Sequence, residues 1–202
     1  MKIPIYKLTI NPDDPNTGVE YVALVNEPAI QRNWIAFSTE EKIKFQIVNE
    51  EKRVISGALM VADLPIYRKA NAKIPTDYYA VFDAETIWQI AQKYFKEKRS
   101  SSVNLMHEPN AKVNDVYCFE SFIIDSKRGI NTPTGFDKLT DGSWFGSFKV
   151  DNEQVWEEVK AGTFKGFSVE GFFEMEPQPS ADEEKILKVI DILNQVNYLE
   201  QD

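Results

Sequence analysis

The chain has 202 residues, of which 43% are apolar and 27% charged, and its formal net charge is −9. This composition is typical of one globular domain with one compact core and at most a small appendage, and the acidic charge argues against nucleic acids and membranes as partners, because both present phosphates. The single cysteine, Cys118, cannot form an intramolecular disulfide, and the sequence shows neither a secretory leader nor an apolar run near the roughly 18 residues of a membrane span, so a reducing intracellular compartment is expected.

The first part of the chain alternates short apolar runs with turn residues, which predicts a series of short strands. Three of these runs lie at residues 20–30, 34–38 and 42–48. A longer run at residues 53–67 is expected to form one strand that ends at Pro65, and the aromatic run at residues 78–82 is expected to form another.

The spacing of the apolar residues becomes helical after Asp83. Ile87, Ile90 and Tyr94 recur at the period of a helix, Asp83 is a suitable N-cap, and a basic cluster that ends at Arg99 suits the C-terminal end of the helix dipole. These features predict a helix that begins after Asp83 and ends in the basic cluster.

The second half of the chain is predicted to alternate strands with helices. Strands are expected at residues 116–125, 143–150 and 164–175. A second helix is expected between Asp151, which forms a capping-box pattern with Gln154, and Gly162 as the C′ residue.

An amphipathic pattern at residues 183–196 predicts a last helix, which follows a proline-containing turn. We therefore expect a main domain at residues 1–176 and a C-terminal linker with an amphipathic helix at residues 177–202. The apolar stripe of this helix suits either self-association or cover of the main domain. Many strands with two or three helices indicate the α+β class.

Two residues stand out as a candidate catalytic pair: Ser168 and the only histidine of the chain, His107. Gly166 and Gly171 flank the serine, so a substrate backbone could approach closely there, or a bulge could re-aim the hydroxyl. In a regular strand Ser168 and Glu170 share the polar face. His107 precedes a glutamate and a proline, at the kind of strand end or loop that often holds catalytic groups. A solvated strand face and a surface histidine are the competing interpretations.

A serine nucleophile needs a base, and an acidic group usually holds that base in place. Glu120 interrupts an apolar run, and a carboxylate buried there would need a partner such as a protonated His107. Asp125 and Glu170 are the alternatives for this third position. Cys118, on the same expected strand face as Glu120, leaves a cysteine nucleophile with His107 as a further hypothesis, although such a cysteine is more often a small core residue.

Seven blocks of the sequence, in their order along the chain, carry a resemblance to a known family. The blocks are LVNEPAI, WIAFS, RVISGALMVADLPIYR, YYAVFDAETIWQIAQKYFK, NLMHEP, FESFIID and WFGSFKVDNEQVWEEVKAGTFKGFSVEGFF. They resemble the XkdF-like phage serine proteases, a branch of the prohead or capsid maturation proteases related to herpesvirus assemblin. In that family the histidine after the helix and the serine of a Gly-x-Ser-[Val/Ile]-x-Gly strand are the base and the nucleophile. The resemblance thus implies these roles for His107 and Ser168.

The resemblance also implies a fold and a biological role. The fold would be an assemblin-like, mainly antiparallel β-barrel surrounded by two or three α-helices. Such proteases are packed inside the immature procapsid in the host cytoplasm, where they cleave scaffolding protein or the scaffolding part of the capsid protein, and often themselves. The expected partners are therefore scaffolding protein and major capsid protein as substrates, together with a homo-oligomer, and neither a cofactor nor a metal ion is expected.

Two departures from the herpesvirus relatives leave part of the site open. Those relatives use a second histidine as the third triad member and an arginine after the serine near the oxyanion, whereas this chain has one histidine and its last arginine is Arg128. Main-chain N–H groups near the serine are the expected oxyanion donors. The alternative function is a non-catalytic phage structural or assembly protein on the same fold, because a fold does not fix a function.

Overall fold

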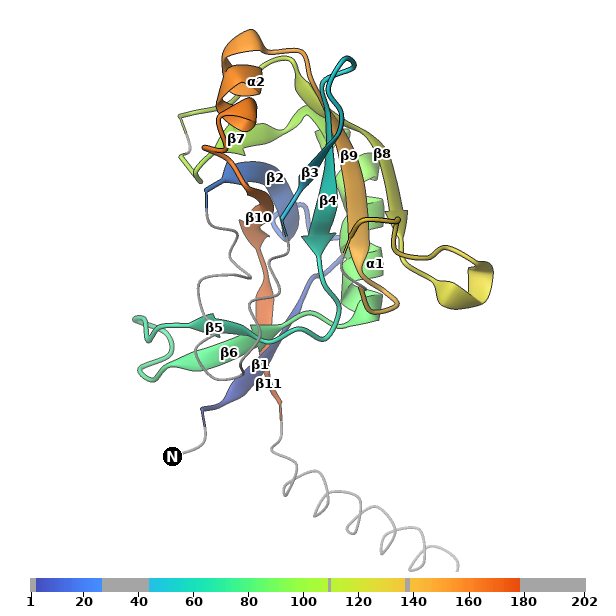
Figure 1. The fold of residues 1–202 in the computed structure, drawn as a ribbon. Coiled ribbons are helices and arrows are strands. Elements are labelled where there is room, and N and C mark those ends of the chain that lie inside the picture. The colour runs from blue at the N-terminus through green and yellow to red at the C-terminus, as the bar shows by residue number, and fades with distance from the viewer. Residues whose placement is uncertain (1–2, 27–43, 109, 137–138, 179–202) are drawn as a thin grey trace, which may run out of the picture.

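The computed structural model describes residues 3–26, 44–108, 110–136 and 139–178, and strands dominate its regular structure (Figure 1). Two α-helices accompany the strands in these residues, α1 (Ala84–Lys96) and α2 (Glu153–Lys160). The strands are β1 (Ile5–Thr9), β2 (Gly18–Val25), β3 (Gln46–Asn49), β4 (Val54–Met60), β5 (Ile66–Arg68), β6 (Tyr78–Val81), β7 (Val103–Leu105), β8 (Val116–Ile123), β9 (Trp144–Val150), β10 (Gly166–Phe172) and β11 (Glu174–Gln178). The α+β class with a majority of sheet is therefore confirmed.

The strands pair into three sheets, whose orders are β3-β4-β9-β8, β10-β2-β7 and β11-β1-β6-β5. The first sheet is wholly antiparallel, while the other two each contain one parallel pair, β2 with β7 and β1 with β6. In the described residues these sheets do not close into a single barrel. The expected antiparallel barrel is thus not found in this part of the chain.

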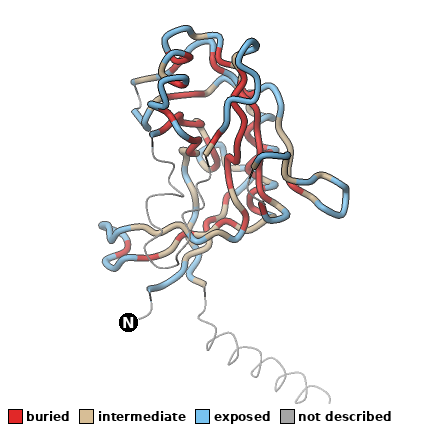
Figure 2. Tube along the Cα trace, viewed as in Figure 1, coloured by how far each residue is buried: buried red, intermediate tan, exposed pale blue. Residues whose placement is uncertain are grey.

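Strands β4 and β9 form the buried centre of the largest sheet (Figure 2). All seven residues of β4 are buried, because side chains pack on both faces of the sheet. Phe148 and Trp144 belong to the main core, whereas Phe145 points into a smaller cluster that contains Ile124 and Leu139. Burial on both faces explains why these strands read as continuous apolar runs rather than as an alternating pattern.

Helix α1 begins where the sequence predicts. The Asp83 side chain accepts a hydrogen bond from the Thr86 N–H at 2.9 Å, which satisfies one of the free donors of the first turn. Ile87, Ile90 and Tyr94 are almost completely buried against the sheets. Burial of each such side chain contributes about 1.5–3 kcal/mol, so this face rather than intrinsic propensity holds the helix.

Helix α2 is capped one residue later than expected. Asn152, not Asp151, is the N-cap, and its side chain accepts a hydrogen bond from the Val155 N–H at 3.0 Å. The Asp151 carboxylate instead forms an ion pair with Lys149 at 2.5 Å, which holds it on the strand side of the turn. Gly162 has φ of +75°, so its predicted place as the left-handed C′ residue is confirmed.

The run at residues 53–67 is two strands rather than one. Strand β4 ends at Met60, and β5 begins at Ile66 and belongs to another sheet. Asp63 between them has φ of +58°, and its N–H donates to the carbonyl of Phe82, so the chain turns at this point instead of continuing to Pro65. The predicted strand at residues 34–38 and the last helix at 183–196 lie outside the described residues.

Candidate active site

Ser168 stands on β10, an outer strand of the three-stranded sheet. In the register of that sheet Ser168 faces Ala23 of β2, and Ala23 faces Asn104 of β7, so the three side chains form one row on one face. Ser168 is 5% exposed and Asn104 is 1% exposed. The competing interpretation of a solvated strand face therefore does not hold at Ser168.

A bulge follows directly after Glu170. The pairing of β10 with β2 shifts between Glu170 and Gly171, which is the irregularity that the flanking glycines allowed. A Cβ atom at Gly171 would lie only 1.9 Å from the carbonyl oxygen of Gly18, so no larger residue fits this backbone approach. The bulge fixes the place at which the polar face of β10 ends.

His107 lies just beyond the end of β7, in an uncommon backbone conformation. Met106 and His107 have φ of +56° and +61°, so two consecutive residues other than glycine adopt the left-handed region. The Met106 N–H donates to the carbonyl of Leu24, and the Glu108 N–H donates to that of Leu105, both at 3.0 Å. Each left-handed residue of this kind costs about 1–2 kcal/mol, and such strain is concentrated at functional sites.

The imidazole of His107 faces a carboxylate that another side chain holds in place. Nδ1 of His107 lies 3.5 Å from Oε2 of Glu170, at the distance of an ion pair when the ring is protonated. The same oxygen accepts a hydrogen bond from Nδ2 of Asn104 at 2.8 Å. The carboxylate is therefore fixed at the Nδ1 side of the ring, which leaves Nε2 as the nitrogen available for acid–base chemistry.

No hydrogen bond joins Ser168 to His107. Within the described residues no hydrogen bond is found for the Ser168 hydroxyl, so no structural bond occupies it. The structure brings His107 and Glu170 together and places Ser168 two residues before Glu170 on the same strand. Catalytic hydrogen bonds in unliganded enzymes are often long or unformed, so this arrangement is compatible with a serine and base that meet when substrate binds.

Glu120 occupies a different environment from the one expected. Glu120 is exposed, because the pairing of β8 with β9 shifts between Cys118 and Glu120 and turns the carboxylate outward. The expected burial of Glu120 is therefore wrong. Oε2 of Glu120 accepts a hydrogen bond from Ser147 at 2.7 Å, and Ser56 donates to Ser147 at 2.8 Å, so this carboxylate ends a chain of hydroxyls in the largest sheet.

The remaining two candidates have structural surroundings. The Asp125 side chain accepts a hydrogen bond from the Arg128 N–H at 3.1 Å and thereby caps a short 3-10 turn. Cys118 is 4% exposed, and burial raises the pKa of its thiol to about 12. A thiol with so high a pKa holds little nucleophilic thiolate near neutral pH, which argues against Cys118 as the nucleophile.

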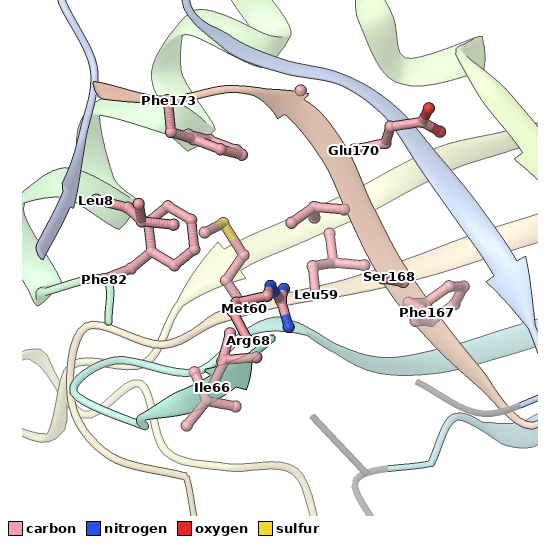
Figure 3. Close-up of a pocket in the computed structure, with 13 residues that line it drawn as sticks. Leu8, Leu59, Met60, Ile66, Arg68, Phe82, Phe167, Ser168, Glu170 and Phe173 are labelled. Carbon is pink, nitrogen blue, oxygen red and sulfur yellow. The ribbon is translucent and has the colours of Figure 1, made fainter. Parts of the chain in front are cut away.

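A cavity of about 300 Å³ lies against β10, and Figure 3 shows its lining. Residues 167–171 of β10 form one wall, apolar side chains from β1, β4 and the turn after β6 form another, and Arg68 of β5 enters it. Neither Arg68 nor Asn104 was a candidate from the sequence. Arg68 ends the RVISGALMVADLPIYR block and Asn104 stands three residues before the histidine, but only the tertiary pairing shows that both lie beside β10.

Two other kinds of site were sought in the described residues. No group of three or more histidine, cysteine, aspartate or glutamate side chains is arranged there to hold a metal ion. In the same part of the chain, neither helix has the length and apolar character needed to cross a membrane.

Comparison with known proteins gives one family and one curated relative. Residues 42–176 match the model of the family described as "Putative phage serine protease XkdF". The relative is the phage-like element PBSX protein XkdF of Bacillus subtilis (strain 168), which is 26% identical in an alignment of 179 residues that covers 82% of this chain. The match covers 58% of the relative, so this chain spans less than two thirds of that protein. A search of the solved structures gives no significant match.

Proposed function

The chain belongs to the XkdF family of phage serine proteases, and on this premise we propose that it is a serine endopeptidase of capsid maturation. In this proposal the substrates are scaffolding protein, major capsid protein and the chain itself, and the place of action is the immature procapsid. The observation that carries the proposal is the contact of His107 with Glu170, which lies on the same strand as Ser168.

The proposed reaction follows the usual division of roles among a nucleophile, a base and an orienting acid. The oxygen of Ser168 attacks the peptide carbonyl, while Nε2 of His107 takes the hydroxyl proton and then gives it to the leaving amine. Water next attacks the acyl-serine and His107 again takes and returns one proton, which restores the hydroxyl and releases the second fragment. Main-chain N–H groups near β10 would hold the oxyanion.

Glu170 is better placed than Glu120 for the orienting role. Its Oε2 atom lies 3.5 Å from Nδ1 of His107, whereas the carboxylate of Glu120 is exposed and accepts a hydrogen bond from Ser147. A carboxylate at Nδ1 selects the tautomer in which Nε2 can accept a proton, and it stabilises the imidazolium that forms. We therefore propose Ser168, His107 and Glu170 as the catalytic set.

The acidic charge of the chain supports a protein partner rather than the genome. A net charge of −9 repels nucleic acid phosphates at physiological salt. This supports a location among capsid proteins inside the procapsid, and self-association there would raise the local concentration of enzyme and substrate.

A non-catalytic assembly protein is the second candidate, and one observation favours it. Ser168 is 5% exposed and makes no hydrogen bond to His107 within the described residues, so its hydroxyl is not in an attacking arrangement in this structure. A protein that only binds capsid components would need no such arrangement. The two functions differ in whether peptide bonds are broken.

Co-expression with the scaffolding and major capsid proteins of the same phage tests the proposal. Fragment masses would be measured by mass spectrometry for the wild type, Ser168→Ala and His107→Ala, with Ser101→Ala, an exposed serine, as the matched control. We expect the wild type and the control to produce the same fragments and the two site variants to produce none. Intact proteins in assembled wild-type particles would overturn the protease function and favour the assembly protein.

A further inference from the structure

The cavity beside β10 contains a cation, and most of the other side chains that line it are apolar. Leu8, Leu59, Met60, Phe82 and Phe173 line it, and the guanidinium of Arg68 lies among these side chains (Figure 3). The same view shows the carboxylate of Glu170 pointing away from Arg68, although its residue also borders the cavity. The cavity, of about 300 Å³, is large enough for an amino-acid side chain.

Arg68 has unused hydrogen-bonding capacity. A guanidinium carries five N–H donors, and the bond found for Arg68 runs from Nη1 to the carbonyl of its neighbour Tyr67, at 3.1 Å. No acidic side chain in the described ranges forms an ion pair with it. Arg68 is only partly exposed, and loss of solvent contact lowers its pKa. A charge withdrawn from water in this way is costly until an anion pairs with it.

The geometry of a guanidinium favours one kind of anion. Its planar fork forms two parallel hydrogen bonds with a carboxylate, and such charge-assisted pairs are about twice as strong as neutral hydrogen bonds. The apolar wall around Arg68 would strengthen this pairing, because it excludes water. A group with a short apolar stem and a terminal carboxylate matches both the wall and the cation.

The backbone of β10 next to this cavity suits an extended peptide. On β2, the Val22 N–H donates to the carbonyl of Ser102, and the carbonyl of Leu24 accepts from the N–H of Met106. Both residues of β2 therefore direct their backbone hydrogen-bonding groups towards β7. Phe167 and Val169, which face them in the register, therefore direct their own N–H and carbonyl groups away from β2. No strand in the described residues pairs with that edge of β10, which borders the cavity.

We propose that Arg68 selects substrates with an acidic side chain, aspartate or glutamate, at one fixed position near the cleaved bond. The peptide would lie along this edge of β10, with which no strand of the described residues pairs, and its carboxylate would enter the cavity and pair with the guanidinium. This inference rests on the proposed endopeptidase function and adds the class of sequence that the site accepts. It makes Arg68 a specificity residue, separate from the proposed catalytic set.

A binding measurement tests the inference without any need for cleavage. The Ser168→Ala protein would be titrated by NMR with acetyl-Ala-Ala-Glu-Ala-Ala-amide and with the same peptide carrying Gln in place of Glu, while the Nε–H signals of arginine are followed. We expect the Glu peptide to bind about tenfold more tightly, which corresponds to one charge-assisted pair of about 1.4 kcal/mol. Equal affinities for the two peptides would overturn the inference.

Substitutions of Arg68 show whether this residue causes the preference for the Glu peptide over the Gln peptide. In the same background, Arg68→Gln is expected to remove the difference between the peptides, and Arg68→Lys to keep only part of it, because lysine lacks the bidentate fork. Lys69→Gln removes one positive charge from an exposed neighbour and should change nothing. Thermal unfolding would confirm that each variant is folded. A full preference in folded Arg68→Gln protein would exclude Arg68 as its cause.

A third peptide separates the two sources of a carboxylate. The Gln peptide with a free C-terminal carboxylate carries the charge at the chain end, and it is expected to bind no better than its amide. If it binds as tightly as the Glu peptide, the cavity recognises a chain terminus and the side-chain assignment is wrong.

Cleavage of a peptide library distinguishes failure of this inference from failure of the proposed function. The wild-type protein should produce fragments with an acidic residue enriched at one position relative to the cut, and Arg68→Gln should lose the enrichment. Cleavage without acidic enrichment would overturn the inference and leave the protease function standing. Absence of cleavage would overturn the protease function, and the peptide titrations would then decide whether Arg68 binds a carboxylate.

Discussion

Glu170 and Asn104 meet across the three-stranded sheet, where Nδ2 of Asn104 donates to Oε2 of Glu170 at 2.8 Å. The two residues are 66 positions apart in the chain, and strand β2 lies between their strands. Because the same oxygen faces Nδ1 of His107 at 3.5 Å, the amide of Asn104 within β7 and the imidazole just beyond the end of β7 both approach one carboxylate of β10. This arrangement positions His107 through Glu170, and Glu170 through Asn104.

Glu170→Gln should reduce cleavage far more than Glu120→Gln. The amide cannot stabilise the imidazolium at Nδ1, and loss of the acid in serine hydrolases lowers kcat by about a hundredfold or more. Glu120 is exposed and bonded to Ser147, so its amide variant should cleave at the wild-type rate. The measurement is the initial rate of fragment formation from scaffolding protein. The reverse ranking of the two variants would identify Glu120 as the third member.

Asn104→Leu should lower kcat by about tenfold and leave KM nearly unchanged, because it removes the donor that holds Glu170 and touches no substrate. The matched control is Asn131→Leu, at an exposed loop position. Thermal unfolding should show that the Asn104 variant is folded, and the pH–rate profile should change with it. If a folded variant has the wild-type pH–rate profile, Asn104 has a structural role only and does not position Glu170 for catalysis.

Local patterns predicted the elements that carry these residues. The N-cap at Asp83 and the helical spacing that follows it were sufficient for α1. The glycines around Ser168 left a close approach or a bulge open, and the structure has a bulge there whose extra residue, Glu20, belongs to β2. Such features depend on neighbours a few residues apart. They can therefore be predicted from the sequence alone.

The pairing between distant strands could not be predicted in the same way. The parallel register of β2 with β7 decides that Asn104 lies beside Glu170, and β7 has only three residues, too few for an alternating pattern. Glu120 was expected to be buried because it interrupts an apolar run, but an irregularity after Cys118 turns it outward. A bulge of one residue reverses the face of every following side chain, and the sequence near Glu120 contains no glycine that would indicate one.

Gly171→Ala should destabilise the protein by about 3 kcal/mol or more, because the new methyl group would overlap the backbone of β2. Its Cβ would lie 1.9 Å from the Gly18 carbonyl oxygen, and backbone cannot move aside as a flexible side chain can. The measurement is the free energy of unfolding from urea titration. Disruption of the bulge should also displace Glu170 and reduce any cleavage.

Gly162→Ala provides the matched control for this substitution. Gly162 has φ of +75° and nothing within 4 Å of an added Cβ, so only backbone strain of about 1 kcal/mol is expected. If the two variants lose the same stability, steric contact with Gly18 is not what makes Gly171 necessary.

The ion pair of Lys7 with Asp83 should make stability depend on acid pH. Burial acts to raise the pKa of Asp83, but hydrogen bonds from Lys7 and Thr86 outweigh it and lower that pKa below its usual value. Because the folded pKa is lower than the unfolded one, the contribution of Asp83 is full above an unfolded pKa of about 3.9 and is lost as the pH falls through the folded value. Thermal unfolding measured between pH 6 and pH 2 should therefore show a fall in stability at the acid end.

Asp83→Asn should flatten part of this fall. Asparagine still caps a helix, so the variant keeps the hydrogen bond to Thr86 but loses the titrating charge that pairs with Lys7. At pH 6 it should be less stable than the wild type by about 0.5–1 kcal/mol, since the pair is partly exposed and solvent screens it. The difference should shrink as the pH falls through the folded pKa of Asp83, because the protonated aspartic acid is then as uncharged as the asparagine. Glu51→Gln, at an exposed turn, is the control for loss of one carboxylate, and an equal flattening in that variant would show that general surface charge rather than the Asp83 cap governs the acid response.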